Sequence, residues 1–165
     1  MRDEGESRLS AVVSCSLRLV YRAALVAAKC WWFVRRPDTR GSLVALWLEG
    51  RVLLVRTSYR PLLTLPGGFV KQGESSQDAG ARELWEELRV VVPAGRLRLA
   101  RQSAIPFEHR NDVVTVWDVT LDEAPLVHVD NRELVWAGWM TPSEALAVPL
   151  LPHVRAYLSE RATGS

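Results

Sequence analysis

The segment 75–88 constrains the fold most strongly, because a helix there would gather three glutamates onto one face. At about 100° per residue, Glu86 and Glu87 lie about 60° and 40° on either side of Glu83. The opposite face is apolar and can pack on a sheet through Ala81, Leu84, Trp85 and Leu88. The sequence therefore predicts an amphipathic helix with an acidic face.

This acidic face predicts a site for a hard divalent cation. Three carboxylates held this close repel one another at neutral pH, and a cation offsets that repulsion. Oxygen ligands in a small space suit Mg²⁺ or Mn²⁺, which bind phosphate oxygens and activate water. A solvated acidic helix face is the alternative interpretation, and the flanking sequence decides between the two.

The rest of the chain alternates strands with helices. Strands are expected where apolar and β-branched residues gather, at 42–48, 52–55, 97–105, 113–121 and 134–139. Helices are expected at 9–34, from Ser75 or Ser76 to Leu88, from the capping box at Thr141, and at 153–161. We expect a sharp bend at 65–69. Hairpins mixed with helices favour an α/β sandwich over a doubly wound parallel sheet.

A spaced motif surrounds the acidic helix. Gly68 is followed after five residues by Glu74, and after seven more by Arg82-Glu83-Leu84-Trp85-Glu86-Glu87-Leu88-Arg89-Val90. This resembles the Nudix box, G-x5-E-x7-R-E-U-x-E-E-x-G-U with U a bulky aliphatic residue, at every specified position except Arg89. The resemblance covers residues 40–160. It implies a Nudix-type α/β/α sandwich with a mixed sheet.

The resemblance also implies roles for the matching residues. Glu86 and Glu87 would be Mg²⁺ ligands, and Glu83 a further ligand or the general base that takes a proton from the attacking water. Gly68 would offer its backbone carbonyl to the metal. Orientation of the loop against the helix would come from an Arg–carboxylate pair, formed by Arg82 and Glu74.

Two features stay open within the family pattern. Some members carry the general base on a later loop, and the sequence does not choose among Glu108, Asp118, Asp122 and Glu123. Arg89 stands where the family has glycine, which would suit a left-handed helix cap. Arginine in that conformation costs about 1 kcal/mol. We therefore expect an altered helix end with the chemistry retained.

The implied activity is Mg²⁺-dependent hydrolysis of a diphosphate bond in a nucleoside diphosphate linked to another group. ADP-ribose-like substrates are favoured, because a proline near position 106 is a feature of family members that cleave ADP-ribose, and Pro106 matches. A non-catalytic nucleotide sensor and a membrane-surface protein are the alternatives. The net charge of +2 is too small to indicate a surface that coats nucleic acid, so no nucleic acid partner is expected.

The N-terminal segment 1–38 is expected to be an amphipathic helical extension of a Nudix domain at 39–165. On a helical wheel Arg18, Arg22, Lys29 and Arg36 form one basic stripe on an otherwise apolar helix. These charges disfavour a membrane span. Residues 9–36 would instead contact a membrane surface, the domain or a second subunit. The acidic first residues lack the pattern of a signal peptide, so a cytoplasmic protein is expected, with the inner face of the membrane as an alternative location.

Overall fold

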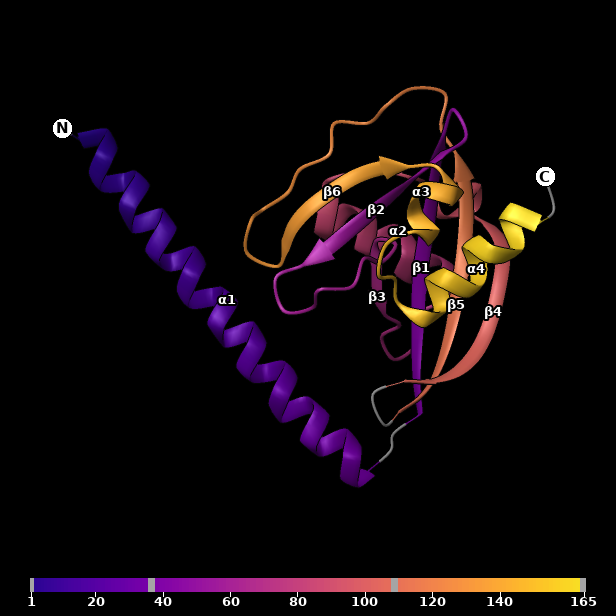
Figure 1. The fold of residues 1–165 in the computed structure, drawn as a ribbon, viewed down its shortest axis with the longest axis horizontal. Helices are drawn as coiled ribbons and strands as arrows, with labels where there is room; N and C mark the ends of the chain where they lie inside the picture. The colour runs from indigo at the N-terminus through magenta and orange to yellow at the C-terminus, as the bar shows by residue number, and fades with distance from the viewer. Residues whose placement is uncertain (1, 36–37, 108–109, 164–165) are drawn as a thin grey trace.

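The computed structural model describes residues 2–35, 38–107 and 110–163. A long helix, α1 (Arg2–Arg35), precedes a mixed sheet that is covered by helices on both faces (Figure 1). The strands are β1 (Asp38–Leu48), β2 (Arg51–Thr57), β3 (Gly67–Phe69), β4 (Arg98–Phe107), β5 (Arg110–Thr120) and β6 (Leu134–Met140). The other helices are α2 (Ser76–Leu88), the 3-10 turn η1 (Ala94–Arg96), α3 (Pro142–Leu146) and α4 (Pro152–Thr163).

The sheet has the order β4-β5-β1-β2-β6, and β3 pairs with β1 outside this path. β1 and β5 are parallel, and the other pairs are antiparallel. The predicted mixed sheet is therefore confirmed. The segment 65–69, expected as a bend alone, also supplies β3, because its glycines let the chain lie close against β1.

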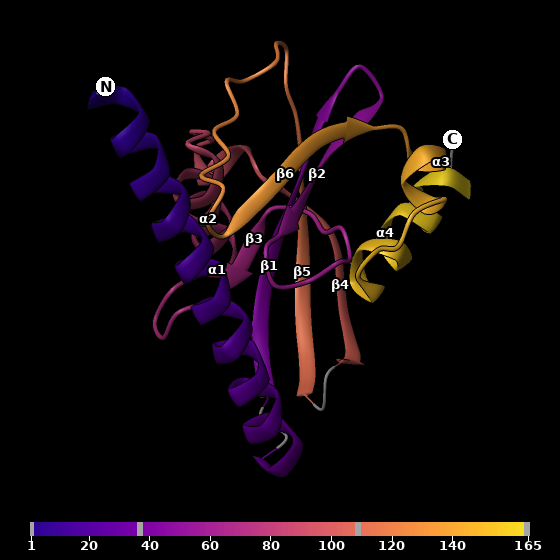
Figure 2. The same ribbon diagram turned by 60° about the vertical axis from the view of Figure 1, so that its left-hand side comes forward.

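Alternating residues of the central strands divide the core into two apolar layers. Val44, Leu46 and Leu53 pack toward α2, where Leu84 and Leu88 are fully buried. Ala45, Val52 and Leu54 point the other way and pack against α3 and α4. Figure 2 shows α2 on one side of the sheet and the two C-terminal helices on the other. The sandwich follows from this two-sided burial.

The two ends of α2 fit the sequence in different ways. The Ser75 side chain accepts a hydrogen bond from the backbone N–H of Asp78, which is the expected N-cap. Arg89 forms the C-cap in the left-handed region, with φ 60° and ψ 22°. Trp85 was expected to pack on the sheet, and this is wrong. Its side chain is half-exposed, and the guanidinium of Arg89 lies 5.1 Å from its ring centroid.

Helix α1 lies along one side of the domain (Figures 1 and 2). Arg18 Nε donates to the Asn131 carbonyl at 2.8 Å, and Arg22 Nε donates to the Ser58 carbonyl at 3.3 Å. The expected basic stripe therefore faces the domain at these two residues, while Arg36 lies outside the described residues. The exposed apolar residues of α1 include Leu19, Val20, Val26 and Trp31. No helix in the described ranges is long and apolar enough to cross a membrane.

Candidate active site

Two glycines of β3 allow the site to form. Gly67 has φ +142°, and a Cβ there would lie 2.1 Å from the carbonyl oxygen of Ser42 on β1. A Cβ on Gly68 would lie 2.5 Å from Oε1 of Glu83. Any side chain at these positions would push β3 away from β1 and α2. The glycine pair therefore brings the β3 backbone against the acidic face of α2.

Glu87 is the most perturbed carboxyl group of that face. Its Oε2 accepts a hydrogen bond of 2.9 Å from the backbone N–H of Gly67. Its pKa is raised to about 8, chiefly by burial. The hydrogen bond from Gly67 lowers the pKa, and the negative charges of Glu83, Glu133 and Glu86 raise it. Without a cation, this buried carboxyl holds its proton at neutral pH.

Arg82 links the loop after β3 to α2. Its guanidinium donates to both carboxylate oxygens of Glu74, at 2.8 and 3.1 Å, and to the Phe69 carbonyl at 3.1 Å. The same side chain reaches Glu83 at 2.7 Å and Glu86 at 2.9 Å. Its hydrogen bond lowers the pKa of Glu74 to about 2. The predicted orienting pair is thus brought together in a bidentate geometry.

Glu133 joins the cluster from the loop before β6, a position that the sequence interpretation did not select. The hydroxyl of Tyr59 donates to Glu133 at 3.4 Å. Burial raises the pKa of Glu133, and the charge of Glu83 adds to the effect. A small cavity is lined by Glu83, Glu86, Glu87, Asp130, Glu133 and Leu134. The acidic cluster is therefore built from two distant parts of the chain.

A larger pocket of about 400 Å³ opens beside the cluster. Cationic side chains at its wall are Lys71, Arg60 and Arg82, and apolar ones include Leu43, Val114 and Leu151. Asp112 also lines this pocket, where it is buried and bonded by the hydroxyl of Thr39. A cavity with acidic, basic and apolar walls can hold a ligand that has both phosphate and apolar parts.

Comparison with known proteins agrees with this geometry. The profile of the NUDIX domain matches residues 37–161. The chain belongs to the Nudix hydrolase family.

Individual Nudix proteins also resemble this chain in sequence and in structure. A curated relative, the NAD-capped RNA hydrolase NudC from Erwinia tasmaniensis, is 32% identical over 112 residues, which are 67% of this chain and 40% of that protein. The chain thus spans less than half the length of this relative. A MutT Nudix hydrolase from Burkholderia pseudomallei is 24% identical with a TM-score of 0.64, covering 76% of this chain and 98% of that one.

A third similar protein is a bifunctional NMN adenylyltransferase/ADP ribose pyrophosphatase from Francisella tularensis, whose structure holds AMP and a manganese ion. It is 16% identical with a TM-score of 0.70, and the match covers 88% of this chain and 48% of that one. Likeness at this identity shows the Nudix fold.

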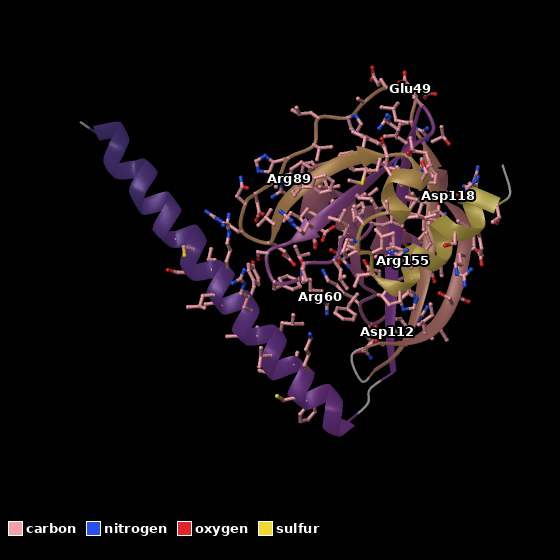
Figure 3. The ribbon with its side chains drawn as sticks, in the orientation of Figure 1. Glu49, Arg60, Arg89, Asp112, Asp118 and Arg155 are labelled. Atoms are coloured by element: carbon pink, nitrogen blue, oxygen red, sulfur yellow. The ribbon has the colours of Figure 1, made fainter. Side chains whose placement is uncertain are left out.

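The predicted alternative bases lie apart from the Nudix cluster or outside the described residues. Asp118 accepts a hydrogen bond of 2.5 Å from the Tyr157 hydroxyl and pairs with Arg161, both on α4. Figure 3 shows it beside α4, away from Arg60. Asp122 and Glu123 are exposed in the loop after β5. Glu108 lies outside the described residues. Among the described residues, the later-loop carboxylates that line a cavity with the Nudix helix are thus Glu133 and Asp130.

The donor set of the Nudix helix fits a hard divalent cation. It combines the mostly buried carboxyl group of Glu87, which would lose its proton on binding a metal, with the carboxylates of Glu83 and Glu86, and all the donors are oxygen atoms. Arg82 engages Glu83 Oε1 and Glu86 Oε2, and within the described residues Glu83 Oε2 and Glu87 Oε1 accept no hydrogen bond. In the described ranges, no three acidic, histidine or cysteine side chains lie close enough together to hold a metal ion. A cation would draw these oxygens together.

Proposed function

We propose that this protein hydrolyses the diphosphate bond of a nucleoside diphosphate linked to a second group, with Mg²⁺ or Mn²⁺ as its cofactor. The observation that carries the proposal is the position of Glu87. This carboxyl group is buried among Glu83, Glu86 and Glu133, beside a pocket large enough for a nucleotide. A structural role would not require so many carboxyl groups in one place.

The metal would be held by the carboxylates of Glu83, Glu86 and Glu87, with the backbone carbonyl of Gly68 as a further donor. Once bound, it supplies charge neutralisation at the phosphate oxygens and a more acidic water. Glu74 and Arg82 would act as positioning residues, because their bidentate pair fixes the loop after β3 against α2.

Glu133 is the proposed proton acceptor, with Glu83 as the alternative that the family pattern offers. Water attacks one phosphorus atom, forming a new P–O bond, and its proton passes to a Glu133 carboxylate oxygen. The bond from that phosphorus to the bridging oxygen breaks, and the bridging oxygen leaves with the second phosphate. The raised pKa of Glu133 makes it a stronger base than an exposed glutamate.

ADP-ribose-like compounds are the proposed substrate class. Their two phosphates match Lys71 and Arg60 in the pocket wall, and their nucleoside matches the apolar wall formed by Leu43, Val114 and Leu151. The Francisella tularensis protein that shares this fold is described as an ADP ribose pyrophosphatase. The NudC relative is described as acting on NAD-capped RNA, so a panel of nucleoside diphosphate derivatives is the appropriate test.

The experiment is a turnover screen of the full chain with Mg²⁺ against ADP-ribose, NAD, sugar nucleotides and nucleoside triphosphates. Release of a nucleoside monophosphate from a diphosphate derivative supports the proposal. Nucleotide binding without turnover of any compound contradicts it and would indicate a sensor. Retention of all four box glutamates argues for the enzyme, since a sensor does not need them.

The apolar face of α1 is proposed to contact a membrane surface or a second copy of the chain. Its support is the exposure of Leu19, Val20 and Val26 on the helix that precedes the proposed catalytic domain at 39–165. Sedimentation of the full chain with anionic vesicles, and its absence for residues 39–165, would indicate the membrane. Dimers that are lost on the same truncation would indicate the second copy. A full chain that stays monomeric and does not sediment with the vesicles would contradict both proposed contacts.

A further inference from the structure

A second cleft lies between α1 and the domain, and it is strongly basic. Its volume is about 550 Å³, and four arginines line it: Arg18 and Arg22 from α1, Arg56 from β2, and Arg60 from the following loop. Among the described residues that line it, none is acidic. Guanidinium groups stay charged at all physiological pH values. Four positive charges are thus gathered in one cleft of a chain whose net charge is only +2.

The contacts of three of these arginines leave their charge uncompensated. Arg18 and Arg22 each donate one N–H to a backbone carbonyl, which is a neutral partner. Within the described ranges, Arg18, Arg22 and Arg56 form no ion pair. Like charges four residues apart on a helix also destabilise it slightly. An anion in the cleft would offset this repulsion and bind several guanidinium groups at once.

This basic cleft adjoins the catalytic pocket. Thr57, Tyr59 and Arg60 line both cavities. Figure 3 shows Arg60 on the side of the domain that faces α1. Tyr59 packs on Tyr21 of α1, with ring centroids 6.2 Å apart, and its hydroxyl donates to Glu133 in the acidic cluster. An acidic site and a basic site therefore share one wall, at the place where a ligand could reach both.

We propose that the basic cleft binds phosphate groups of the substrate that lie beyond the diphosphate being cut. This inference rests on the proposed hydrolase function and extends its substrate range. Besides ADP-ribose-like compounds, the site then accepts small nucleotides with more than two phosphates, whose scissile diphosphate lies at the acidic cluster and whose other phosphates lie among the four arginines. Helix α1 then belongs to the substrate site, because it supplies Arg18 and Arg22.

Binding of inorganic tripolyphosphate by the full chain, measured by calorimetry without metal, tests the cleft directly. We expect salt-sensitive binding that R18Q/R22Q and R56Q each weaken at least about tenfold. The matched control is R96Q/R98Q, because Arg96 and Arg98 also donate to backbone carbonyls but lie at η1 and the start of β4. Among the described residues Arg56 has no hydrogen bond to α1, so its variant separates loss of the anion site from loss of the helix contact.

Turnover provides the second readout. The ratio of kcat/KM for diadenosine tetraphosphate to that for ADP-ribose should fall at least about tenfold in R18Q/R22Q and stay unchanged in R96Q/R98Q. Failure of the wild type to cut any compound of the nucleotide panel would contradict the hydrolase function, while the tripolyphosphate titration would still decide the cleft. Equal tripolyphosphate affinity of wild type and R56Q overturns the inference. Tight binding of a single-stranded RNA without any binding of tripolyphosphate also overturns it, in favour of an RNA surface.

Discussion

The backbone N–H of Gly67 donates a hydrogen bond of 2.9 Å to the carboxyl group of Glu87. This contact joins the glycine-rich strand β3 to the acidic face of α2. The two residues that make it are 20 positions apart in the chain. It holds a mostly buried carboxyl group in place whose pKa is about 8. The contact between β3 and α2 is therefore made without a cation, and burying this carboxyl group has a cost that the metal-free protein should reveal.

The stability of the metal-free protein should fall as the pH rises. The pKa of Glu87 is about 8 in the folded state and 4.5 when the side chain is exposed to water, so only the folded state holds this proton between those values. Each rise in pH across that window therefore favours unfolding. The melting temperature in EDTA should fall from pH 5 to pH 8. Glu87→Gln should flatten that fall and be the more stable protein at pH 8. Parallel curves for the two proteins would show that Glu87 is not held protonated.

Glu133→Gln should reduce kcat at least about a hundredfold while the KM changes little, because the amide cannot accept the proton of water. In wild type, kcat should fall at acidic pH as Glu133 is protonated, and this acidic limb should be absent from the pH profile of the variant. Glu123→Gln is the matched control, since Glu123 is exposed in the same connection between β5 and β6. Wild-type turnover in Glu133→Gln would return the role of base to Glu83.

Arg89→Gly should change the free energy of unfolding by less than about 1 kcal/mol, because two effects oppose each other. Glycine relieves the left-handed C-cap, while the stacking of Arg89 on Trp85 is lost. Turnover should stay within a few-fold of wild type. In a Trp85→Ala background the same change should be more stabilising, which denaturant titrations of all four proteins would measure. Identical effects in both backgrounds would exclude the stacking contribution.

Glu74 should make the fold sensitive to acid. Its pKa is lowered from 4.5 to about 2, chiefly by the hydrogen bond from Arg82. A lowered pKa stabilises the folded state fully above pH 4.5, and this contribution disappears as the pH falls toward 2. Unfolding followed by circular dichroism should show that wild type loses stability over that pH interval. Glu74→Gln should be less stable than wild type above the interval and should lose less stability across it. A variant as stable as wild type at pH 7 would contradict the pairing.

The local elements and the box were predictable from the sequence, because their signals are short-range. The N-cap at Ser75 and the capping box at Thr141 are present as expected. The predicted strands agree with β1, β2, β4, β5 and β6 to within a few residues, apart from the earlier start of β1. Helix α1 begins at Arg2 and not at residue 9. Hydrophobic periodicity and caps specify such features without tertiary information.

The remaining parts of the site depend on contacts between distant segments. Glu133 reaches Glu87 only because β6 pairs with β2, and no local pattern at 130–134 marks this pairing. Trp85 is exposed although it lies at an apolar position of the helical wheel, since the buried face of α2 runs through Ala79, Gly80, Leu84 and Leu88 and leaves Trp85 outside it. The direction of the basic stripe of α1 is likewise a tertiary feature. One signal for Glu133 was available, namely an acidic residue just before a strand in a family whose base can lie on a later loop.

Hydrolysis of ADP-ribose by wild type and Glu87→Gln, side by side in Mg²⁺, tests the central claim most directly. The account predicts AMP and ribose 5-phosphate from wild type, and turnover lower by at least about a hundredfold in the folded variant, because the amide cannot ligate the metal as a carboxylate does. Circular dichroism of both proteins controls for folding. Equal turnover by the two proteins would contradict the assignment of this buried carboxyl group to the catalytic metal site.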